Sequence, residues 1–346
     1  MIDFRYHLVS IVAVFLALAI GIVLGSTELQ GPAFSLLDKT TSKLQNELGQ
    51  VSSQRDTAQQ QATEGEMYAQ AVEPALLHNL LTGHRLLIVT EPGAQSSVVS
   101  GITAAAIHAG ATVTGQINLQ PKFFDTSGTA QDSLNQTTLA VAQPTGLQLD
   151  ASATYQQQAA QLIASEILTS APGSAAGVPG GSQGTGTDAS TMLQAYAASQ
   201  FLSTSGQPAT PASLAVVVTP QTAPSDGSTD QLAQVLPPLV QELAAKSAAT
   251  VVVGSSTGSG AGSPIAVLRS NSVSSQVSTV DDADLAAGQT VAMQALAVEL
   301  AGGKAGSYGF TANGATAIAP SPAPTPSASA SATPSSTSTK KKKASR

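Results

Sequence analysis

The five residues Gly254 to Gly258 match a catalytic motif, because Gly-Ser-Ser-Thr-Gly has the form G-x-S-x-G and directly follows an apolar segment. In a nucleophile elbow this pattern exposes the central serine, here Ser256, on a turn between a strand and a helix. A helix should therefore follow, but the next residues are Ser-Gly-Ala-Gly-Ser-Pro. A histidine should also come later in the chain, whereas the last one is His108. We expect no hydrolase from this motif.

The glycine-rich segments do not predict a nucleotide site. Thr-Glu-Pro-Gly-Ala, residues 90–94, lacks the further glycines of G-x-G-x-x-G. Gly302-Gly303-Lys304 is followed by Ala305, where a phosphate loop has Ser or Thr. The sequence therefore predicts no enzyme and no cofactor.

Three carboxylates, Asp281, Asp282 and Asp284, follow the short apolar segment Val-Ser-Thr-Val. At the carboxyl edge of a parallel sheet, ligands commonly bind, and three such groups suit a hard cation. The alternative is that one aspartate caps a helix over 284–302 and the others stabilise its positive end. Arg269 is a candidate ion-pair partner for one of them.

Soft metal ions need Cys, His or Met side chains in clusters. The chain has no Cys, so disulfides, thiolate metal sites and cysteine nucleophiles are excluded. Its histidines and methionines stand singly and show no ligand spacing. The sequence therefore predicts no local copper site. The histidines and methionines of the chain are His7, His78, His84, His108, Met1, Met67, Met192 and Met293.

The N-terminus predicts a membrane anchor over residues 1–27. No Asp, Glu, Lys or Arg occurs from Tyr6 to Thr27, and the apolar run from Leu8 to Gly25 is long enough for roughly 27 Å of helix. The alternative is a cleaved signal peptide, for which Ala17-Leu18-Ala19 has the small-x-small pattern. Cleavage there would leave a short apolar segment, which favours an uncleaved anchor. Arg5 and the amino terminus favour a cytoplasmic N-terminus with the rest of the chain outside.

Residues 28–74 predict a coiled-coil stalk, whose helix begins at the break Gly31-Pro32 and ends near Pro74. Nine positions alternate by three and four residues, as the a and d positions of heptads do. They are Phe34, Leu37, Thr41, Leu44, Leu48, Val51, Arg55, Ala58 and Ala62. We expect a homo-oligomer formed through Phe34, Leu37, Leu44, Leu48 and Val51. The alternative is that this seam packs on the chain's own domain.

Residues 85–312 predict an α/β domain of the Rossmann-like kind, with a doubly wound, mostly parallel sheet. Short apolar segments, typical of buried parallel strands, alternate with helical ones. We expect strands at 85–90, 112–119, 214–220, 250–254 and 277–280, and helices at 96–110, 129–142, 153–169, 190–204, 228–246 and 284–302. The segment 171–190 predicts a flexible insertion, and 313–346, rich in Ala, Pro, Ser and Thr, a disordered tail.

Charge is distributed unevenly. Lys340 to Lys343 and Arg346 supply five of the 14 basic residues, which leaves nine against 21 acidic residues in 1–339. An acidic body of this kind argues against a nucleic-acid partner. The lysine-ended tail is either a contact to anionic wall polymer or lipid, or a solvated end.

The opening MIDFRYHLVSIVAVFLALAIGIVLGS, the heptad stretch and VSTVDDADLAAGQ…AVELAGGKAGSYGF together resemble the mycobacterial copper transport protein B (MctB) family of actinobacterial envelope proteins. The resemblance runs from residue 1 to about residue 310. Where family members often read Val-Asp-Asn, this chain has Val280-Asp281-Asp282. The resemblance implies an outer-membrane, channel-like protein that keeps intracellular copper low. A second branch of the family implies a role in cell separation with a partner membrane protein.

Two functions remain open from the sequence. The first, implied by the resemblance, is a transport or channel component of copper efflux in the cell envelope. The second, favoured by the residues themselves, is a non-enzymatic envelope scaffold built from an anchor, a stalk and an interaction domain. A membrane β-barrel needs many segments of about ten alternating residues, whereas this chain predicts short strands, helical crossovers and one span. Any pore would therefore require several chains.

Overall fold

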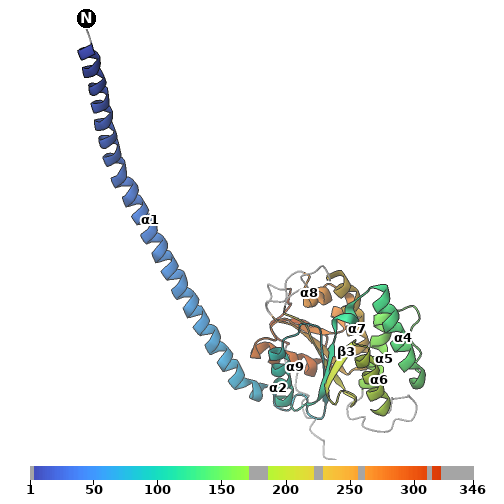
Figure 1. The fold of residues 1–346 in the computed structure, drawn as a ribbon. Helices are drawn as coiled ribbons and strands as arrows, with labels where there is room; N and C mark the ends of the chain where they lie inside the picture. Colours follow the sequence, from blue (N-terminus) through green and yellow to red (C-terminus); the bar gives the residue numbers. More distant parts are fainter. Residues whose placement is uncertain (1–3, 171–185, 222–228, 256–261, 310–313, 321–346) are drawn as a thin grey trace, which may run out of the picture. The chain divides into compact units, whose positions relative to one another are not determined.

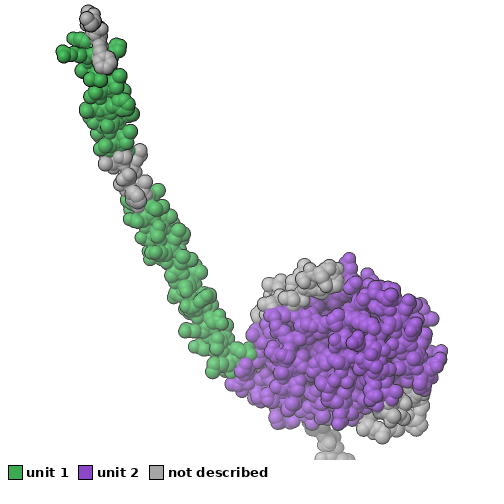
Figure 2. Space-filling view, viewed as in Figure 1, with its two compact units in different colours: residues 1–68 green, residues 69–346 purple. Residues whose placement is uncertain are grey.

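A computed structural model describes residues 4–170, 186–221, 229–255, 262–309 and 314–320 (Figure 1). The chain divides into two compact units, Met1–Tyr68 and Ala69–Arg346 (Figure 2). The lysine-rich end of the tail and most of the expected insertion, 171–185, lie outside the described residues.

A single helix, α1 (Phe4–Leu77), forms the described part of the first unit and continues into the second. Its segment Arg5–Gly25 has a mean hydropathy of 2.9 and buries none of its side chains within the chain. Because 21 helical residues extend roughly 31 Å, this segment is long and apolar enough to cross a bilayer. The helix therefore continues from the candidate span directly into the expected stalk.

The expected break at Gly31-Pro32 is wrong, because α1 passes through both residues without interruption. Proline removes one main-chain hydrogen bond and crowds the preceding turn. Long helical runs on both sides keep the helix going, since helix propagation is far less costly than starting a new helix.

The second unit is built on a seven-stranded sheet with the order β3-β2-β1-β4-β5-β6-β7. All neighbouring strands are parallel except β2 and β3, which are antiparallel. The mostly parallel α/β sheet expected from the sequence is therefore confirmed. The strands are β1 (Arg85–Thr90), β2 (Thr112–Leu119), β3 (Leu202–Gly206), β4 (Leu214–Val218), β5 (Ala249–Val253), β6 (Ser278–Val280) and β7 (Ser307–Tyr308).

Helices cover both faces of this sheet (Figure 1). One face, called here the α7 face, packs its apolar side chains against α4, α5, α6 and α7, and the other, the α9 face, against α2 and α9. Successive residues of a strand point to opposite faces, so strands that are apolar throughout, such as β4, are buried on both sides. The helices are α2 (Ser96–His108), α3 (Pro121–Phe124), α4 (Gly128–Thr145), α5 (Tyr155–Ile167), α6 (Gly186–Ala198), α7 (Thr229–Lys246), α8 (Pro264–Arg269) and α9 (Ala286–Leu300), with a short 3-10 helix at Ser272–Ser275.

The last turns of α1 belong to the α/β unit. Leu77 and the following Leu81 are fully buried in the core of the α9 face. Glu73, buried, accepts a 2.9 Å contact from His108 Nδ1 at the end of α2. The helix that carries the candidate span is thus joined to the domain by core packing and by a polar pair.

Two edge strands were not anticipated. The helix expected at 190–204 ends at Ala198, and Leu202–Gly206 forms β3 instead. The sequence Leu-Ser-Thr-Ser-Gly lacks apolar alternation because four of its residues are exposed, so the usual strand signal is missing. At the other edge β7 has two residues, and Ala317, within the expected tail, pairs with Tyr308.

Candidate functional site at the carboxyl edge of the sheet

The residues that directly follow four parallel strands form one row across the carboxyl edge of the sheet. Glu91 N–H donates to Val218 O at 2.9 Å, and Thr219 N–H donates to Val253 O at 2.9 Å. Gly254 N–H donates to Val280 O at 2.8 Å. The ladder therefore extends one residue beyond the strands and fixes Glu91, Thr219, Gly254 and Asp281 in sequence along this edge.

Glu91 follows β1 beside β4, where the strand order reverses and α/β proteins commonly bind ligands. Its side chain is buried, with 3% exposed, and its Oε1 has no hydrogen-bond partner among the described residues. Burial raises the pKa of Glu91 to about 8, so this carboxyl is mostly neutral at pH 7. Glu91 belongs to no recognised motif, so the sequence did not predict it as a site residue. The one feature that could have indicated it is its position immediately after the first apolar strand.

The loops after β1 and β4 meet beside Glu91. Ala94 N–H bonds back to Glu91 O at 3.1 Å, and Gly93 takes a positive φ of 83° to make this turn. The Gln95 amide donates to the Gln221 amide oxygen, which links the two loops. These contacts join the first residues of the loops that follow β1 and β4.

The carboxylate of Asp281 is engaged in an ion pair with Arg269. Arg269 Nη1 donates to its Oδ2 at 2.7 Å, and both side chains are buried. The same guanidinium donates to Thr279 Oγ1 at 3.0 Å and to Tyr308 O at 2.7 Å. The expected pairing of Arg269 with one of the aspartates is confirmed, and it ties α8 to β6 and β7.

Asp282 differs from Asp281, because its buried Oδ1 has no partner among the described residues. Burial, reinforced by the charge of Asp281, raises the pKa of Asp282 to about 6. A Cβ on Gly288 would lie 2.6 Å from Asp282 Oδ1, so only glycine lets α9 approach this closely. Leu285, rather than an aspartate, occupies the N-cap position of α9 and makes no capping side-chain bond.

The carboxylates of the edge do not converge on one point. Among the described residues no group of three or more His, Asp or Glu side chains is placed to hold a metal ion, and Asp281, Asp282 and Asp284 are within the part searched. Glu91 and Asp281 follow strands three positions apart in the sheet, roughly 14 Å at the usual strand spacing. The edge therefore holds two separate acidic positions.

The remaining candidates are dispersed. Gly254 and Ser255 are described and buried, whereas Ser256 and the rest of the G-x-S-x-G pattern lie outside the described residues. Met192 and Met293 belong to the cores of opposite faces. His84 Nδ1 lies 3.2 Å from Ser213 Oγ.

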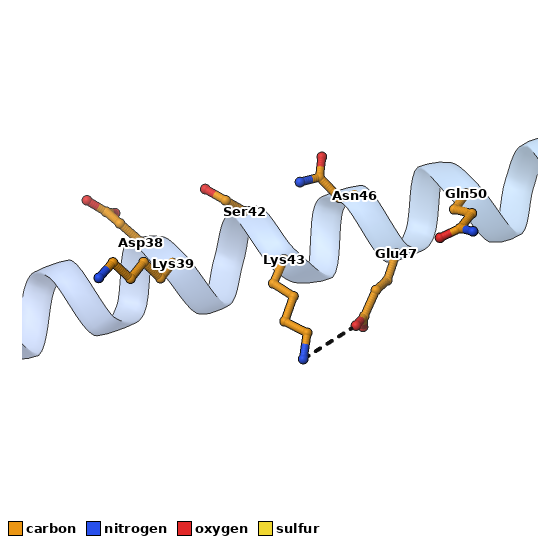
Figure 3. A pocket seen from close by; sticks show the side chains of 7 residues that line it. All are labelled: Asp38, Lys39, Ser42, Lys43, Asn46, Glu47 and Gln50. Atoms are coloured by element: carbon orange, nitrogen blue, oxygen red, sulfur yellow. Dashed lines mark ion pairs between the residues drawn. The ribbon is translucent and has the colours of Figure 1, made fainter.

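The hollow on α1 is of another kind, because one helix supplies its whole lining (Figure 3). Lys43 and Glu47 form an ion pair across it at 3.7 Å, and both are mostly exposed. The lining is polar and omits every position of the expected heptad seam. It consists of Asp38, Lys39, Ser42, Lys43, Asn46, Glu47 and Gln50.

Comparison with known proteins gives one consistent result. Residues 1–320 match the family described as "Copper transport outer membrane protein, MctB". Proteins named "Copper transporter MctB" from Mycobacterium tuberculosis and Mycobacterium bovis are each 27% identical over 320 residues, covering 92% of this chain and 99% of the relative. The protein of that name from Mycobacterium leprae is 27% identical over 324 residues, with the same shares covered.

Proposed function

Because this chain belongs to the MctB family of copper transport proteins, we propose that it is a membrane-anchored envelope component of copper efflux that works as an assembly of several copies. The observation that carries the proposal is the match over residues 1–320, which includes the apolar segment, the rest of α1 and the α/β domain. Copper is the cargo of the assembly in this proposal and is not a resident cofactor.

We place the N-terminus in the cytoplasm and the α/β domain outside it. One helix, Arg5–Gly25, has the length and composition of a span in the described part of the chain, so the residues beyond it lie on one side of the membrane. Arg5 at its start favours this orientation. A periplasm-type reporter fused after Ile318 is expected to be active, whereas activity of a cytoplasm-only reporter at that position would reverse the orientation.

Assembly through the stalk is supported by the apolar side chains that α1 exposes. Four side chains of the expected seam are more than half exposed: Leu37 (64%), Leu44 (53%), Leu48 (69%) and Val51 (62%). Burying such a side chain contributes roughly 1.5–3 kcal/mol, so a row of them on one helix face favours association with another helix. The side chain of Phe34 lies outside the described residues.

The stalk proposal is tested on the full chain in detergent by sedimentation. Leu44→Gln with Leu48→Gln removes two seam side chains and is expected to shift the oligomer toward the monomer. Ser42→Gln with Asn46→Gln is the matched control, because both residues line the polar hollow of Figure 3. Equal masses for the two double variants would contradict assembly through this seam.

An envelope scaffold in cell separation is the second candidate function. It is favoured by the construction of α1, since a 74-residue helix with exposed apolar positions suits a connector between a membrane and a protein partner. Such a scaffold would need no contact with copper.

A deletion strain separates the two candidates. Copper efflux predicts raised cell copper, measured by mass spectrometry after growth in added copper, with normal septation at ordinary copper. The scaffold predicts chained cells at ordinary copper and an unchanged copper content. Restoring the full chain should reverse whichever defect appears, and a strain with neither defect would contradict both candidates.

A further inference from the structure

The edge strand β3 is exposed without the features that usually protect such edges. It runs antiparallel to β2, and its residues Ser203 to Gly206 are exposed. Natural edge strands commonly carry charges, prolines or bulges that prevent pairing with another chain. Leu-Ser-Thr-Ser-Gly contains no charged residue and no proline.

The hydrogen bonds of β2 and β3 show which backbone groups face outward. Gln207 N–H donates to Thr114 O at 2.8 Å, and Gln120 N–H donates to Phe201 O at 2.9 Å. The main-chain N–H and C=O groups of successive residues point to opposite sides of an antiparallel strand. Those of Ser203 and Ser205 therefore also point toward β2. Thr204 therefore directs its N–H and C=O to the open edge, where they make no hydrogen bond to the described part of the chain.

The space beside this edge is open on both faces of the sheet. A cavity of about 560 Å³ lies between α2 and β2 on the α9 face, and one of about 530 Å³ lies beside α6 on the α7 face. Gly206 lines both cavities, and neither lining contains a charged residue. Among the described residues, the space beside Gly206 is therefore free of charged side chains on both faces of the sheet.

We propose that β3 pairs antiparallel with β3 of a second copy, centred on Thr204, so that two seven-stranded sheets become continuous. This inference rests on the proposed association of copies through α1. An antiparallel pair of identical strands is related by a twofold axis, with Thr204 opposite Thr204 and Ser203 opposite Ser205. A parallel two-helix coiled coil also has a twofold axis, so both contacts belong to the same symmetry class.

A second copy suits this edge better than a foreign peptide does. Its Ser203, Thr204 and Ser205 are small and uncharged, and Thr and Ser pairs across strands are favourable. Five residues are too few to hold two chains together alone. In copies already joined by α1 the β3 contact becomes an intramolecular step, which lets a weak contact contribute to the assembly.

The absence of cysteine from the chain makes the test direct. In a hydrogen-bonded antiparallel pair the Cα atoms lie about 5.5 Å apart, within the roughly 4.4–6.8 Å that a disulfide spans. Full-length Thr204→Cys in membranes treated with diamide is expected to give a dimer on a non-reducing gel. Ser203→Cys co-expressed with Ser205→Cys is expected to give the mixed dimer. Ser275→Cys, exposed in the 3-10 helix, is the matched control and should stay monomeric.

A separate variant, Leu44→Cys, reports on the stalk itself. If Leu44→Cys forms dimers and Thr204→Cys does not, the β3 contact is wrong and the stalk proposal stands. If neither forms dimers, both proposals are wrong. Equal dimer yields from Thr204→Cys and Ser275→Cys would indicate random collision and overturn the β3 contact. A Thr204→Cys adduct of another mass would assign the edge to a different protein and overturn it as well.

Discussion

Replacing Glu91 by glutamine tests whether the buried carboxyl at the carboxyl edge of the sheet keeps its proton at neutral pH. The pKa of Glu91 is raised from 4.5 to about 8 in the folded chain because its side chain is buried. Below pH 4.5 the folded and unfolded states are both protonated, and the residue adds no pH dependence. As the pH rises toward 8, only the unfolded state loses this proton, so the folded state becomes less stable.

The expected magnitude follows from the same shift. Each pH unit within this window costs about 1.4 kcal/mol, so the step from pH 5.5 to pH 7.5 removes about 3 kcal/mol from the free energy of unfolding. The side chain of the Glu91→Gln variant cannot ionise. Between pH 5.5 and pH 7.5 its free energy of unfolding should therefore fall by about 3 kcal/mol less than that of the wild type. The buried amide has its own cost, but this cost is the same at both pH values. The difference between the two slopes therefore isolates the carboxyl.

The assay is urea unfolding of the full chain in detergent, with the unfolded fraction read by brief proteolysis at pH 5.5 and pH 7.5. Asp132→Asn is the matched control, because Asp132 is an exposed carboxylate of the same domain. It should keep the wild-type slope. If Glu91→Gln also keeps the wild-type slope, Glu91 is ionised in the folded protein and our description of this position is wrong.

Three further predictions use the same urea assay at pH 7. Arg269→Gln leaves Asp281 buried without its cation and is expected to lower the free energy of unfolding by roughly 3–5 kcal/mol. The control Lys304→Gln, at an exposed position, should leave this free energy almost unchanged. Gly115→Ala places a Cβ 2.6 Å from Ser205 O and should cost roughly 1–3 kcal/mol; the control is Gly128→Ala, where a Cβ meets nothing within 4 Å. Tyr196→Phe removes the 2.9 Å hydrogen bond to Thr138 and should cost roughly 1–3 kcal/mol. An unchanged midpoint in any of these variants would contradict the contact concerned.

The central strands β1, β4 and β5 were predictable because they are buried on both faces. Continuous apolar segments such as Leu214–Val218 can be satisfied only between two layers of helices, so composition alone indicates them. Strand β3 was not predictable in this way, because an exposed edge selects neither apolar residues nor alternation. The continuity of α1 through Pro32 also depends on the helical runs around it rather than on the local pair Gly31-Pro32.

The candidate site was predictable only in part. The run of aspartates after β6 is visible as a cluster in the sequence, and its pairing with Arg269 was anticipated. Glu91 stands alone in the sequence, and its burial at 3% exposure results from the folding of distant segments around β1. The contact between Glu73 and His108 likewise joins residues from two helices, which no spacing rule connects.

The central claim, that copies of this chain assemble through α1 to export copper, is tested most directly by the copper content of a complemented deletion strain. The strain receives the wild-type chain, Leu44→Gln with Leu48→Gln, or the control Ser42→Gln with Asn46→Gln, at equal membrane levels. We predict that the wild type and the control restore low cell copper and that the seam variant does not. Full restoration by a seam variant shown to be monomeric would contradict the claim.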